Sequence, residues 1–565
     1  MFDRLFKRFK GRKEKLKSIL VNPDEIFLDS SNIPSFNHDQ FEGRIETPIP
    51  KTYLVILKSL FLFMVLVFAA RGVFLQITKG DYYFTRASTN NLKKEVIFSH
   101  RGIIADRNDK LLAWNVESED NDFDRRSYID KPGFANVLGF VKYPARDSKG
   151  NFYSFSSAGQ DGIEKYFDQK LAGENGAKLS EVSVKGEIES QSTLEPPVNG
   201  EKINLSIDTD VQSAFYRNIA DAVEQSGFVG GTGVIMNAKT GEVLAMVSYP
   251  DYDSQLMTEG SDNESIKSIL SNKRQPFLDR AVTGLYAPGS IVKAYLALGV
   301  LQENIIDPGK FIHTIGYISI PNPYDKDSPS IFKDWKNHGD VDLKRALSVS
   351  SDVYFYMVGG GYQGQKGLGI LKIEEYMKKF LFGTATEGFF EGPAGTIPSP
   401  EWKKKTFDGD IWRIGDTYHT AIGQYGFQVT PLQVARAMTG IANEGIIVSP
   451  TIIKNEQGTT TSLIGIDKNN FKIVKEGMRM AVTDGTAIAL NISGIDVAGK
   501  TGTAELGSAK QRVNSWVEGF FPYEDPKYTF AVVLENGPAS YAVSAMQAMG
   551  HTLSWITENT DEYVK

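Results

Sequence analysis

The chain has 565 residues and a formal net charge of −7, with 41% hydrophobic residues, 23% charged residues and no cysteine. This ordinary composition argues against a fibrous, a largely disordered or a polytopic membrane protein. Without cysteine the chain can form no disulfide, no thiol nucleophile and no cysteine-bound zinc or iron–sulfur cluster. The negative charge argues against nucleic acid as a partner, and the length alone suggests two to four domains.

The N-terminal end is strongly basic. Residues 1–17 contain eight Lys and Arg and two acidic residues, a local charge of +6, so the rest of the chain carries −13. Phe and Leu recur there at helical spacing, which predicts a short basic amphipathic helix. Two interpretations stay open: contact with anionic lipid or a cytoplasmic partner, or a solvated tail that only sets topology. Residues 18–50 show no periodicity, and we expect a cytoplasmic linker.

An apolar segment, Tyr53–Ile77, follows the linker. Its part Leu54–Leu75 would extend about 33 Å as an α-helix, enough to cross a bilayer. Lys58 and Arg71 lie near its ends, where long cationic side chains reach the headgroups. Because about 50 residues precede it, we expect an uncleaved signal anchor rather than a cleaved signal. The N-terminus would be cytoplasmic and the rest of the chain periplasmic or extracellular.

The remaining sequence divides into two regions. Residues 78–205 contain short β-like runs and Gly-rich turns, whereas helices and strands are intermixed in residues 206–565. In the second region we expect a helix over 210–225, a β-hairpin over 231–249 and a second strand pair within 494–537. This pattern predicts an α+β fold with an antiparallel sheet covered by helices.

The strongest chemical signal is Ser290, which follows Pro288-Gly289 and opens an apolar helix. Lys293 comes one helical turn later, so its amine and the Ser290 hydroxyl share a face. A lysine with a lowered pKa can deprotonate a serine nucleophile without any histidine. The amide of Ser290, at the helix N-terminus, can stabilise an oxyanion. Alone this Ser-x-x-Lys spacing is weak evidence, because both residues are common.

Two further elements follow in chain order: the triplet Ser350-Ser351-Asp352 and the run Lys500-Thr501-Gly502-Thr503. The three elements occur in this order in active-site-serine acyltransferases that handle penicillin and D-alanyl-D-alanine. Ser350 can relay a proton to a leaving amine, and Lys500 favours a substrate carboxylate and disfavours charge on Lys293. Gly502 permits close approach of an edge strand, and the Thr503 amide is a second oxyanion donor. Each element could be merely structural, but their order and contexts together favour function.

With these motifs the sequence resembles the class B penicillin-binding proteins, single-span D,D-transpeptidases that cross-link peptidoglycan. The resemblance runs from about residue 54 to 545 and includes HRGIIADRNDKLLAWN, GQDGIEKYFDQKLAGENG and WRIGDTYHTAIGQYGFQVTPLQVARAM. The Asp-Trp-Lys stretch, the Ser-x-Asp variant and Trp-x-x-Gly-Asp-Thr are similar to the elongation branch, penicillin-binding protein 2. The resemblance implies a tail and linker (1–52), a transmembrane anchor (53–77), a mixed α/β pedestal of the dimerisation type (78–205) and a transpeptidase domain of the penicillin-binding/serine β-lactamase-like fold (206–565).

The resemblance also implies a mechanism. Ser290 would attack the carbonyl between the two terminal D-alanines of a donor stem peptide, and Lys293 would take its proton. Ser350 would pass that proton to the departing D-alanine. The residues expected to bind substrate are Asp352, Thr501, Gly502 and Thr503, together with Lys500. An amine of a second stem peptide would complete the cross-link, and β-lactams would acylate the same serine.

The resemblance further implies partners: a SEDS-family glycosyltransferase and other membrane proteins of an elongation complex. We expect no cofactor and no metal. His338 lies near Asp334 and Asp340 in sequence, and we interpret it as a capping or hydrogen-bonding histidine rather than a metal ligand.

The sequence departs from the family at three places. Asp352 stands where the superfamily more often has Asn, although the elongation branch accepts Asp. Asp279 replaces the Asn of the usual Asn-Arg-Ala, and Tyr425 replaces the last Gly of the usual Gly-Gln-Gly. The change at Tyr425 leaves the shape of the loop Gly423-Gln424-Tyr425 open.

Other functions remain as alternatives. A septal class B transpeptidase would have the same motifs. A D,D-carboxypeptidase or β-lactamase would use water as acceptor, but a membrane anchor followed by a pedestal disfavours a small secreted hydrolase. A β-lactam sensor, or a non-catalytic activator of a glycan polymerase, is the alternative from a different class. Sensor ectodomains usually end a polytopic chain, unlike this one.

Overall fold

The computed structural model describes residues 51–564 except 91, 149, 151, 183–187, 323–326, 463, 464, 508 and 509. The chain forms two compact units, residues 1–91 and 92–565, and each is described by itself. The basic amphipathic helix and the linker expected before residue 51 lie outside the described residues.

The first unit is helical. Helix α1 (Lys51–Val73) continues through a π-helical turn (Phe74–Thr78), and α2 (Gly80–Asn90) follows. Over Lys51–Thr78 the mean hydropathy reaches 2.4 and no residue is buried by protein. Within the described residues this is the one helix long and apolar enough to cross a membrane. An apolar surface on every side of a helix is stable in lipid rather than in water, so α1 fits the single-pass anchor predicted from the sequence.

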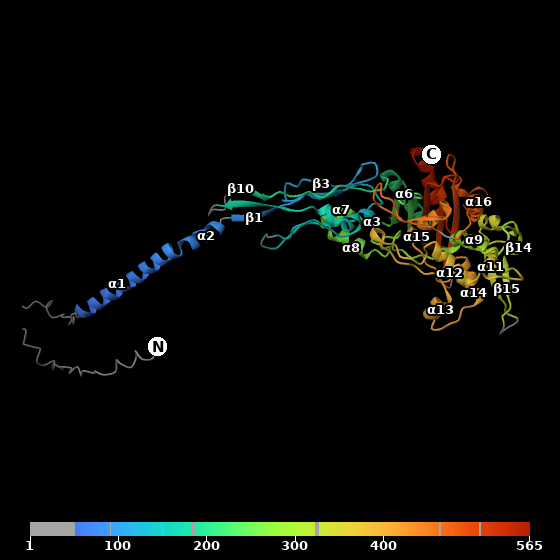
Figure 1. Cartoon of the computed structure of the whole chain (residues 1–565), viewed down its shortest axis with the longest axis horizontal. Coiled ribbons are helices and arrows are strands. Elements are labelled where there is room, and N and C mark those ends of the chain that lie inside the picture. The colour runs from blue at the N-terminus through green and yellow to red at the C-terminus, as the bar shows by residue number, and fades with distance from the viewer. Residues whose placement is uncertain are drawn as a thin grey trace, which may run out of the picture. The chain divides into compact units, whose positions relative to one another are not determined.

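The second unit begins with small sheets. The first sheet has the order β1-β9-β10, with β1 (Leu92–Ile97), β9 (Gly176–Val182) and β10 (Ile188–Glu195). The next has the order β11-β2-β3-β4, with β11 (Ile203–Asn204), β2 (Ile104–Ala105), β3 (Leu111–Val116) and β4 (Arg125–Tyr128). Two short pairs are β5 (Val141–Lys142) with β8 (Ala158–Gly159) and β6 (Ala145–Arg146) with β7 (Phe152–Ser154). The helices here are α3 (Ala135–Leu138), α4 (Gly162–Tyr166) and α5 (Asp168–Ala172). Figure 1 shows β1 and β10 at one end of this unit.

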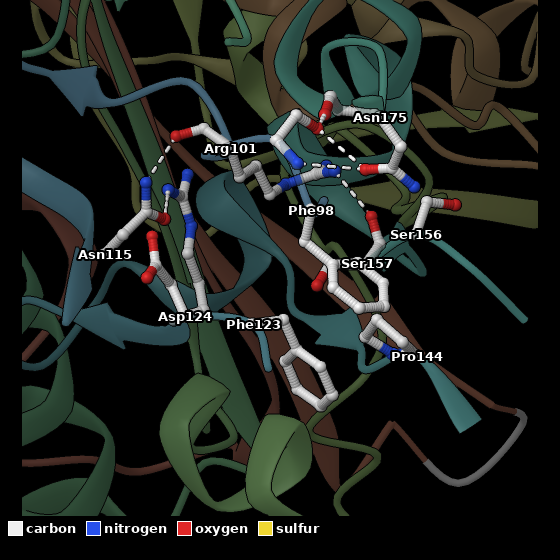
Figure 2. A pocket seen from close by; sticks show the side chains of 12 residues that line it. Phe98, Arg101, Asn115, Phe123, Asp124, Pro144, Ser156, Ser157 and Asn175 are labelled. Atoms are coloured by element: carbon white, nitrogen blue, oxygen red, sulfur yellow. Dashed lines mark hydrogen bonds between the residues drawn. The ribbon is translucent and has the colours of Figure 1, made fainter. Parts of the chain in front are cut away.

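A buried ion cluster joins the elements of this pedestal. Glu164 is fully buried and accepts from Arg101 Nε at 2.6 Å and from Arg126 Nε at 2.7 Å. Both arginines line a small cavity of about 20 Å³, which is room for one water. Figure 2 shows Arg101 beside Asn115, whose amide donates to the Arg101 carbonyl. Within the described part of the chain, Arg126 Nη2 is buried there without a hydrogen-bond partner, so a water in this cavity would satisfy it.

Replacing Glu164 by glutamine should lower the free energy of unfolding by about 3 kcal/mol, because two buried guanidinium groups lose their shared counter-charge. Denaturant titration of the purified protein measures this. The control is Glu375→Gln, which removes a half-exposed ion-pair partner of Lys372 and Lys379 and should change stability by no more than about 0.5 kcal/mol. Equal effects of the two substitutions would contradict a structural role for the cluster.

The C-terminal part of the second unit is built on a five-stranded antiparallel sheet. Its order is β13-β12-β22-β21-β20, with β13 (Val243–Tyr249), β12 (Gly230–Asn237), β22 (Tyr528–Pro538), β21 (Arg512–Phe521) and β20 (Ala498–Leu506). The predicted hairpin is confirmed as β12–β13. The expected second strand pair is wrong in one respect, since its second segment forms two strands. Pro522 and Pro526 lie in the turn between them, where a central strand cannot continue.

Helices cover both faces of this sheet. One core contains side chains of α6 (Thr209–Ser226) and α17 (Ala545–Asn559). The predicted helix over 210–225 is thus confirmed as α6, with Asp208 as its N-cap. The opposite core contains α9 (Lys293–Gln302), α15 (Pro431–Ala442) and α16 (Lys468–Asp484). Strand β21 alternates between them, with Trp516 and Phe520 in the α9 core and Val517 and Phe521 in the α6 core.

The remaining elements complete the domain. The other helices are α7 (Ser254–Glu259), α8 (Asn263–Ser271), α10 (Leu343–Ser348), α11 (Asp352–Gly360), α12 (Ile370–Lys379), α13 (Pro400–Thr406) and α14 (Ile414–Ala421), with 3₁₀ turns η5 (Gly289–Val292), η6 (Gly388–Phe390) and η7 (Ile488–Leu490). Three short strand pairs are β14 (Ile312–Thr314) with β17 (Gly339–Val341), β15 (Tyr317–Ile320) with β16 (Ser330–Lys333), and β18 (Ile446–Val448) with β19 (Thr460–Ser462). Figure 1 shows α9, α11, α14 and β15 on one side of the sheet.

Candidate active site

Ser290 lies in the turn η5, directly before α9. Gly289 has φ +59°, and a Cβ at that position would be 2.6 Å from the Thr503 carbonyl oxygen. A Cβ at Gly502 would be 2.9 Å from the Pro288 carbonyl oxygen. Glycine at both positions therefore lets the turn that carries Ser290 pack against the backbone of β20.

Two buried lysines converge on Ser350. Lys293 Nζ donates to Asp352 Oδ1 at 2.6 Å and to the Ser350 carbonyl at 2.9 Å, and it lies 3.4 Å from Ser350 Oγ. Lys500 Nζ donates to Ser350 Oγ at 2.8 Å and to the Thr501 carbonyl at 2.8 Å. The structure thus brings three of the predicted catalytic side chains into contact. Among the described residues no hydrogen bond joins Lys293 Nζ to Ser290, whose side chain is half-buried one turn earlier.

The backbone at Ser350 is left-handed, with φ +57°. A non-glycine residue in this conformation is strained, and such strain persists where surrounding contacts impose it. The next residue, Ser351, is the N-cap of α11 and accepts from the Tyr354 amide. Asp352 begins that helix. The strained residue therefore directs its hydroxyl into the space between the two lysines, while its neighbours build the helix that carries Asp352.

Asp334 anchors this turn, a role that the sequence analysis missed. Its Oδ2 accepts from Ser351 Oγ at 2.8 Å and from the Val353 amide at 2.9 Å. The Asp-Trp-Lys motif was the signal that could have indicated it. His338 Nε2 lies 3.5 Å from Asp334 Oδ1, whereas Asp340 instead contacts His313 Nδ1 at 2.7 Å. The three residues considered as a cluster from the sequence are therefore not gathered in one place.

Burial perturbs the titration of two groups in the site. Burial lowers the pKa of Lys500 well below its usual value, and the neighbouring Lys293 lowers it further. Burial raises the pKa of Asp352, although the Lys293 amine opposes this effect. An isolated charge is therefore unfavourable in this site, and a pair of opposite charges is more favourable.

Strand β20 forms the other wall of the site. It is the last strand of the sheet and pairs on one side with β21. Thr501 is half-buried and its Oγ1 donates to Thr486 Oγ1 at 2.7 Å, whereas Gly502 is buried and Thr503 is exposed. The free edge of such a strand offers amides and carbonyls to an extended peptide. Thr501, Gly502 and Thr503 thus lie on one edge strand that packs against the turn of Ser290, whereas the fourth residue predicted to bind substrate, Asp352, begins α11.

At the two other departures from the family motifs, Asp279 and Tyr425, side-chain contacts support the local backbone conformation. Asp279 Oδ1 accepts from the amides of Ala281 and Val282, which an Asn side-chain oxygen would also do. Tyr425 has φ +65°, and its ring stacks on Phe407 with centroids 6.3 Å apart. This packing holds a tyrosine in a conformation usually given to glycine.

The loop before Tyr425 supports the turn that carries Ser290. The Gly289 amide donates to the Gly423 carbonyl at 3.0 Å. Gly423 has φ +73°, and a Cβ there would be 2.1 Å from the Gly289 carbonyl oxygen. Replacing Gly423 by alanine should therefore displace the Ser290 turn and slow acylation by a penicillin at least tenfold, since small misplacements cost large factors in rate.

The matched control for this substitution is Gly409→Ala. Gly409 has φ +87°, but no heavy atom lies within 4 Å of the Cβ position. Both substitutions carry similar backbone strain, and only the first meets the nucleophile turn. Stopped-flow acylation rates distinguish them. If both slowed acylation equally, the contact of Gly423 with Gly289 would have no special role.

Comparison with known proteins places the chain in a family. Residues 231–553, more than half of the chain, match the penicillin binding protein transpeptidase domain, and residues 121–205 match the penicillin-binding protein dimerisation domain. The peptidoglycan D,D-transpeptidase MrdA of Haemophilus influenzae is 32% identical over 480 residues, which cover 78% of this chain and 71% of the relative. 

Solved structures agree with this relationship. Pseudomonas aeruginosa PBP2 in complex with WCK 5153 is 30% identical with a TM-score of 0.65, covering 83% of this chain and 98% of that one. PBP2 from Helicobacter pylori in complex with MreC is 25% identical with a TM-score of 0.67, covering 83% of this chain and 99% of that one. The predicted α+β architecture is confirmed. The chain belongs to the class B penicillin-binding proteins, in their elongation-type PBP2 branch of peptidoglycan D,D-transpeptidases.

Proposed function

We propose that this protein cross-links peptidoglycan stem peptides during cell elongation through an acyl-enzyme on Ser290. The observation that carries the proposal is the convergence of Lys293 and Lys500 on Ser350, beside the turn that holds Ser290. Nucleophile, base, proton relay and cationic anchor are then available within one site. Nothing in the comparisons favours the septal, hydrolase or sensor alternatives.

The first half-reaction forms the acyl-enzyme. Ser290 Oγ attacks the carbonyl carbon between the two terminal D-alanines, and a neutral Lys293 amine accepts the hydroxyl proton. The amides of Ser290 and Thr503 donate to the developing oxyanion. Ser350 Oγ then transfers a proton to the nitrogen of the departing D-alanine, and Ser350 regains one from Lys293.

The second half-reaction forms the cross-link. An amine of a neighbouring stem peptide attacks the acyl-enzyme carbonyl and gives one proton to the Lys293 amine, which is deprotonated again after the first half-reaction. Lys293 then passes this proton to the Ser290 oxygen as the bond between that oxygen and the acyl carbon breaks. In the first half-reaction, before D-alanine departs, Lys500, Thr501 and Thr503 hold the terminal carboxylate of the donor, while Asp352 and Gly502 shape its site. A β-lactam carries an amide and a carboxylate in a similar arrangement, so it acylates Ser290 and stays bound.

Membrane topology and partners follow the same proposal. The N-terminus lies in the cytoplasm, α1 crosses the cytoplasmic membrane once and the catalytic domain lies outside it, where its substrate is. The H. pylori relative is solved in a complex with MreC, which supports an elongation-complex protein as a partner here. A SEDS-family glycosyltransferase is the second proposed partner, because it would supply the glycan strands to be cross-linked.

The full-length protein with synthetic donor and acceptor stem peptides tests the activity. We expect cross-linked dimers by mass spectrometry together with release of D-alanine. Release without dimers would instead indicate a carboxypeptidase. Co-purification with a glycan polymerase tests the partner, and loss of the complex when the pedestal is truncated would support it.

A further inference from the structure

A carboxyl group that the mechanism does not use lies behind the two lysines. Glu518, on β21, is fully buried. Its register partner on β20 is Lys500, and paired residues of neighbouring strands project from the same face of a sheet. Because Trp516 and Phe520 on β21 pack in the core with α9, the alternation of the strand directs Glu518 to that core as well.

The helix that follows Ser290 contacts this carboxyl directly. Tyr295 Oη, two residues beyond Lys293, donates to Glu518 Oε2 at 2.7 Å. Glu518 Oε1 is buried and has no hydrogen-bond partner among the described residues. A buried carboxylate oxygen without a hydrogen-bond partner lowers the stability of the fold. Its presence beside the site therefore points to a function.

Few other titratable groups face Glu518. From α9 it meets Tyr295, and from β20 it meets Lys500. On β22 the residue registered with it is Ala531. On α15, the buried guanidinium of Arg436 donates hydrogen bonds to the carbonyls of Leu381 and Thr384. Lys293 lowers the pKa of Lys500 and Asp352 raises it, so both act on Glu518 indirectly, through the charge of Lys500.

The electrostatics of this pair follow from burial. Burial raises the pKa of Glu518 well above its usual value, and the donated hydrogen bond from Tyr295 and the charge of Lys500 oppose this effect. Burial lowers the pKa of Lys500, and Glu518 is one of the two carboxylates that oppose it. An isolated charge on either group is unfavourable, but an ammonium on Lys500 with an ionised Glu518 makes a neutral pair.

We propose that Glu518 is a positioning residue that keeps the proton on Lys500 and so maintains the cationic anchor for the substrate carboxylate. This inference rests on the proposed function of Lys500. In the free protein Glu518 supplies the counter-charge from the neighbouring strand, on the same face of the sheet as Lys500. When a donor peptide arrives, its carboxylate meets an ammonium that is already charged, and no proton has to be taken from solvent.

The test is the pH dependence of acylation of the full-length protein by a fluorescent penicillin, compared between wild type and Glu518→Gln. The substitution keeps the size of the side chain and a hydrogen-bond acceptor for Tyr295 but removes the negative charge. Lys500 should then lose its proton at lower pH. We expect the alkaline limb of the second-order acylation rate to move down by about one pH unit, as for the loss of one nearby opposite charge.

Tyr295→Phe is the second variant, and it keeps the carboxyl. Without the Tyr295 donor the ionised form of Glu518 is less stable, so the alkaline limb should move in the same direction by a smaller amount. This variant provides the test if Glu518→Gln does not fold. Lys344→Gln, which removes an exposed charge paired with Glu476 on the protein surface, should leave the profile unchanged.

The outcomes separate this inference from the proposed function. A wild-type protein that forms no penicillin adduct would overturn the proposed function and this inference together. A wild type that is acylated, with Glu518→Gln and Tyr295→Phe giving superposable pH profiles, would overturn this inference alone. A shift of the alkaline limb in folded Glu518→Gln or Tyr295→Phe protein supports it.

Discussion

Ser290→Ala should abolish covalent labelling by a fluorescent penicillin and lower cross-linking at least about 10⁴-fold, as loss of the nucleophile does in other serine enzymes. The reason is chemical. Ser290 carries the one hydroxyl of the turn Gly289–Val292, which leads into α9, so the alanine variant has no nucleophile there. Within the described residues the Ser290 hydroxyl forms no hydrogen bond that holds the fold together. The variant should therefore unfold at nearly the wild-type denaturant concentration, which circular dichroism measures.

Ser351→Ala is the control for this prediction. Ser351 lies in the same site but caps α11 and donates to Asp334. Its loss should cost about 1 kcal/mol of stability and leave penicillin labelling intact. The two serines are thus expected to differ in opposite ways, one in chemistry and one in stability. Persistent labelling of the Ser290→Ala protein at another residue would contradict the assigned nucleophile.

Lys293→Met should affect both chemistry and stability. Without the amine, Ser290 has no base, and acylation should fall at least about 10³-fold, within the range for loss of general base catalysis. Asp352 would also lose the ammonium that lies 2.6 Å away. Breaking one partner of such a buried pair costs about 3–5 kcal/mol, which denaturant unfolding measures.

The pH dependence of this stability loss has a definite sign. Lys293 lowers the pKa of Asp352 against the raising effect of burial, so removing Lys293 raises that pKa further. A protonated Asp352 needs no counter-charge. The stability difference from wild type should therefore be largest at high pH and shrink as the pH falls through the raised pKa of Asp352.

A double variant separates the two roles of Lys293. Lys293→Met with Asp352→Asn removes both charges, so most of the lost stability should return. Acylation should stay lost, because the base is still missing. Recovery of acylation in the double variant would show that Lys293 serves only as a counter-charge for Asp352.

The sequence predicted the elements whose signals are local. Two apolar, β-rich runs around a Lys-Thr-Gly turn indicated β12–β13, and the N-terminal Asp indicated α6. The number of strands at the end of the chain was wrong because the interpretation treated Trp516–Gly537 as one strand. Pro522 and Pro526 were the local signal for the break. Strand order could not be predicted, because β12 pairs with β22, almost 300 residues later, through long-range packing.

For the site, chain order and chemistry predicted which residues meet. Ser290, Lys293, Ser350 and Lys500 were identified from three motifs. The structure brings both lysines into contact with Ser350, and the catalytic roles of the four residues stay a prediction. The contacts of Asp334 and Glu518 could not be predicted. Asp334 acts through a helix cap formed by a distant turn, and Glu518 reaches the site only because β21 registers it opposite Lys500.

The convergence on Ser350 has a practical consequence. Lys293 and Lys500 come from positions 57 residues before and 150 residues after it in the chain. These three side chains can meet only in a completely folded catalytic domain, and the strained conformation of Ser350 has no support outside it. Covalent labelling by penicillin therefore requires a native catalytic domain. In any preparation, the labelled fraction gives the fraction of molecules whose catalytic domain is completely folded.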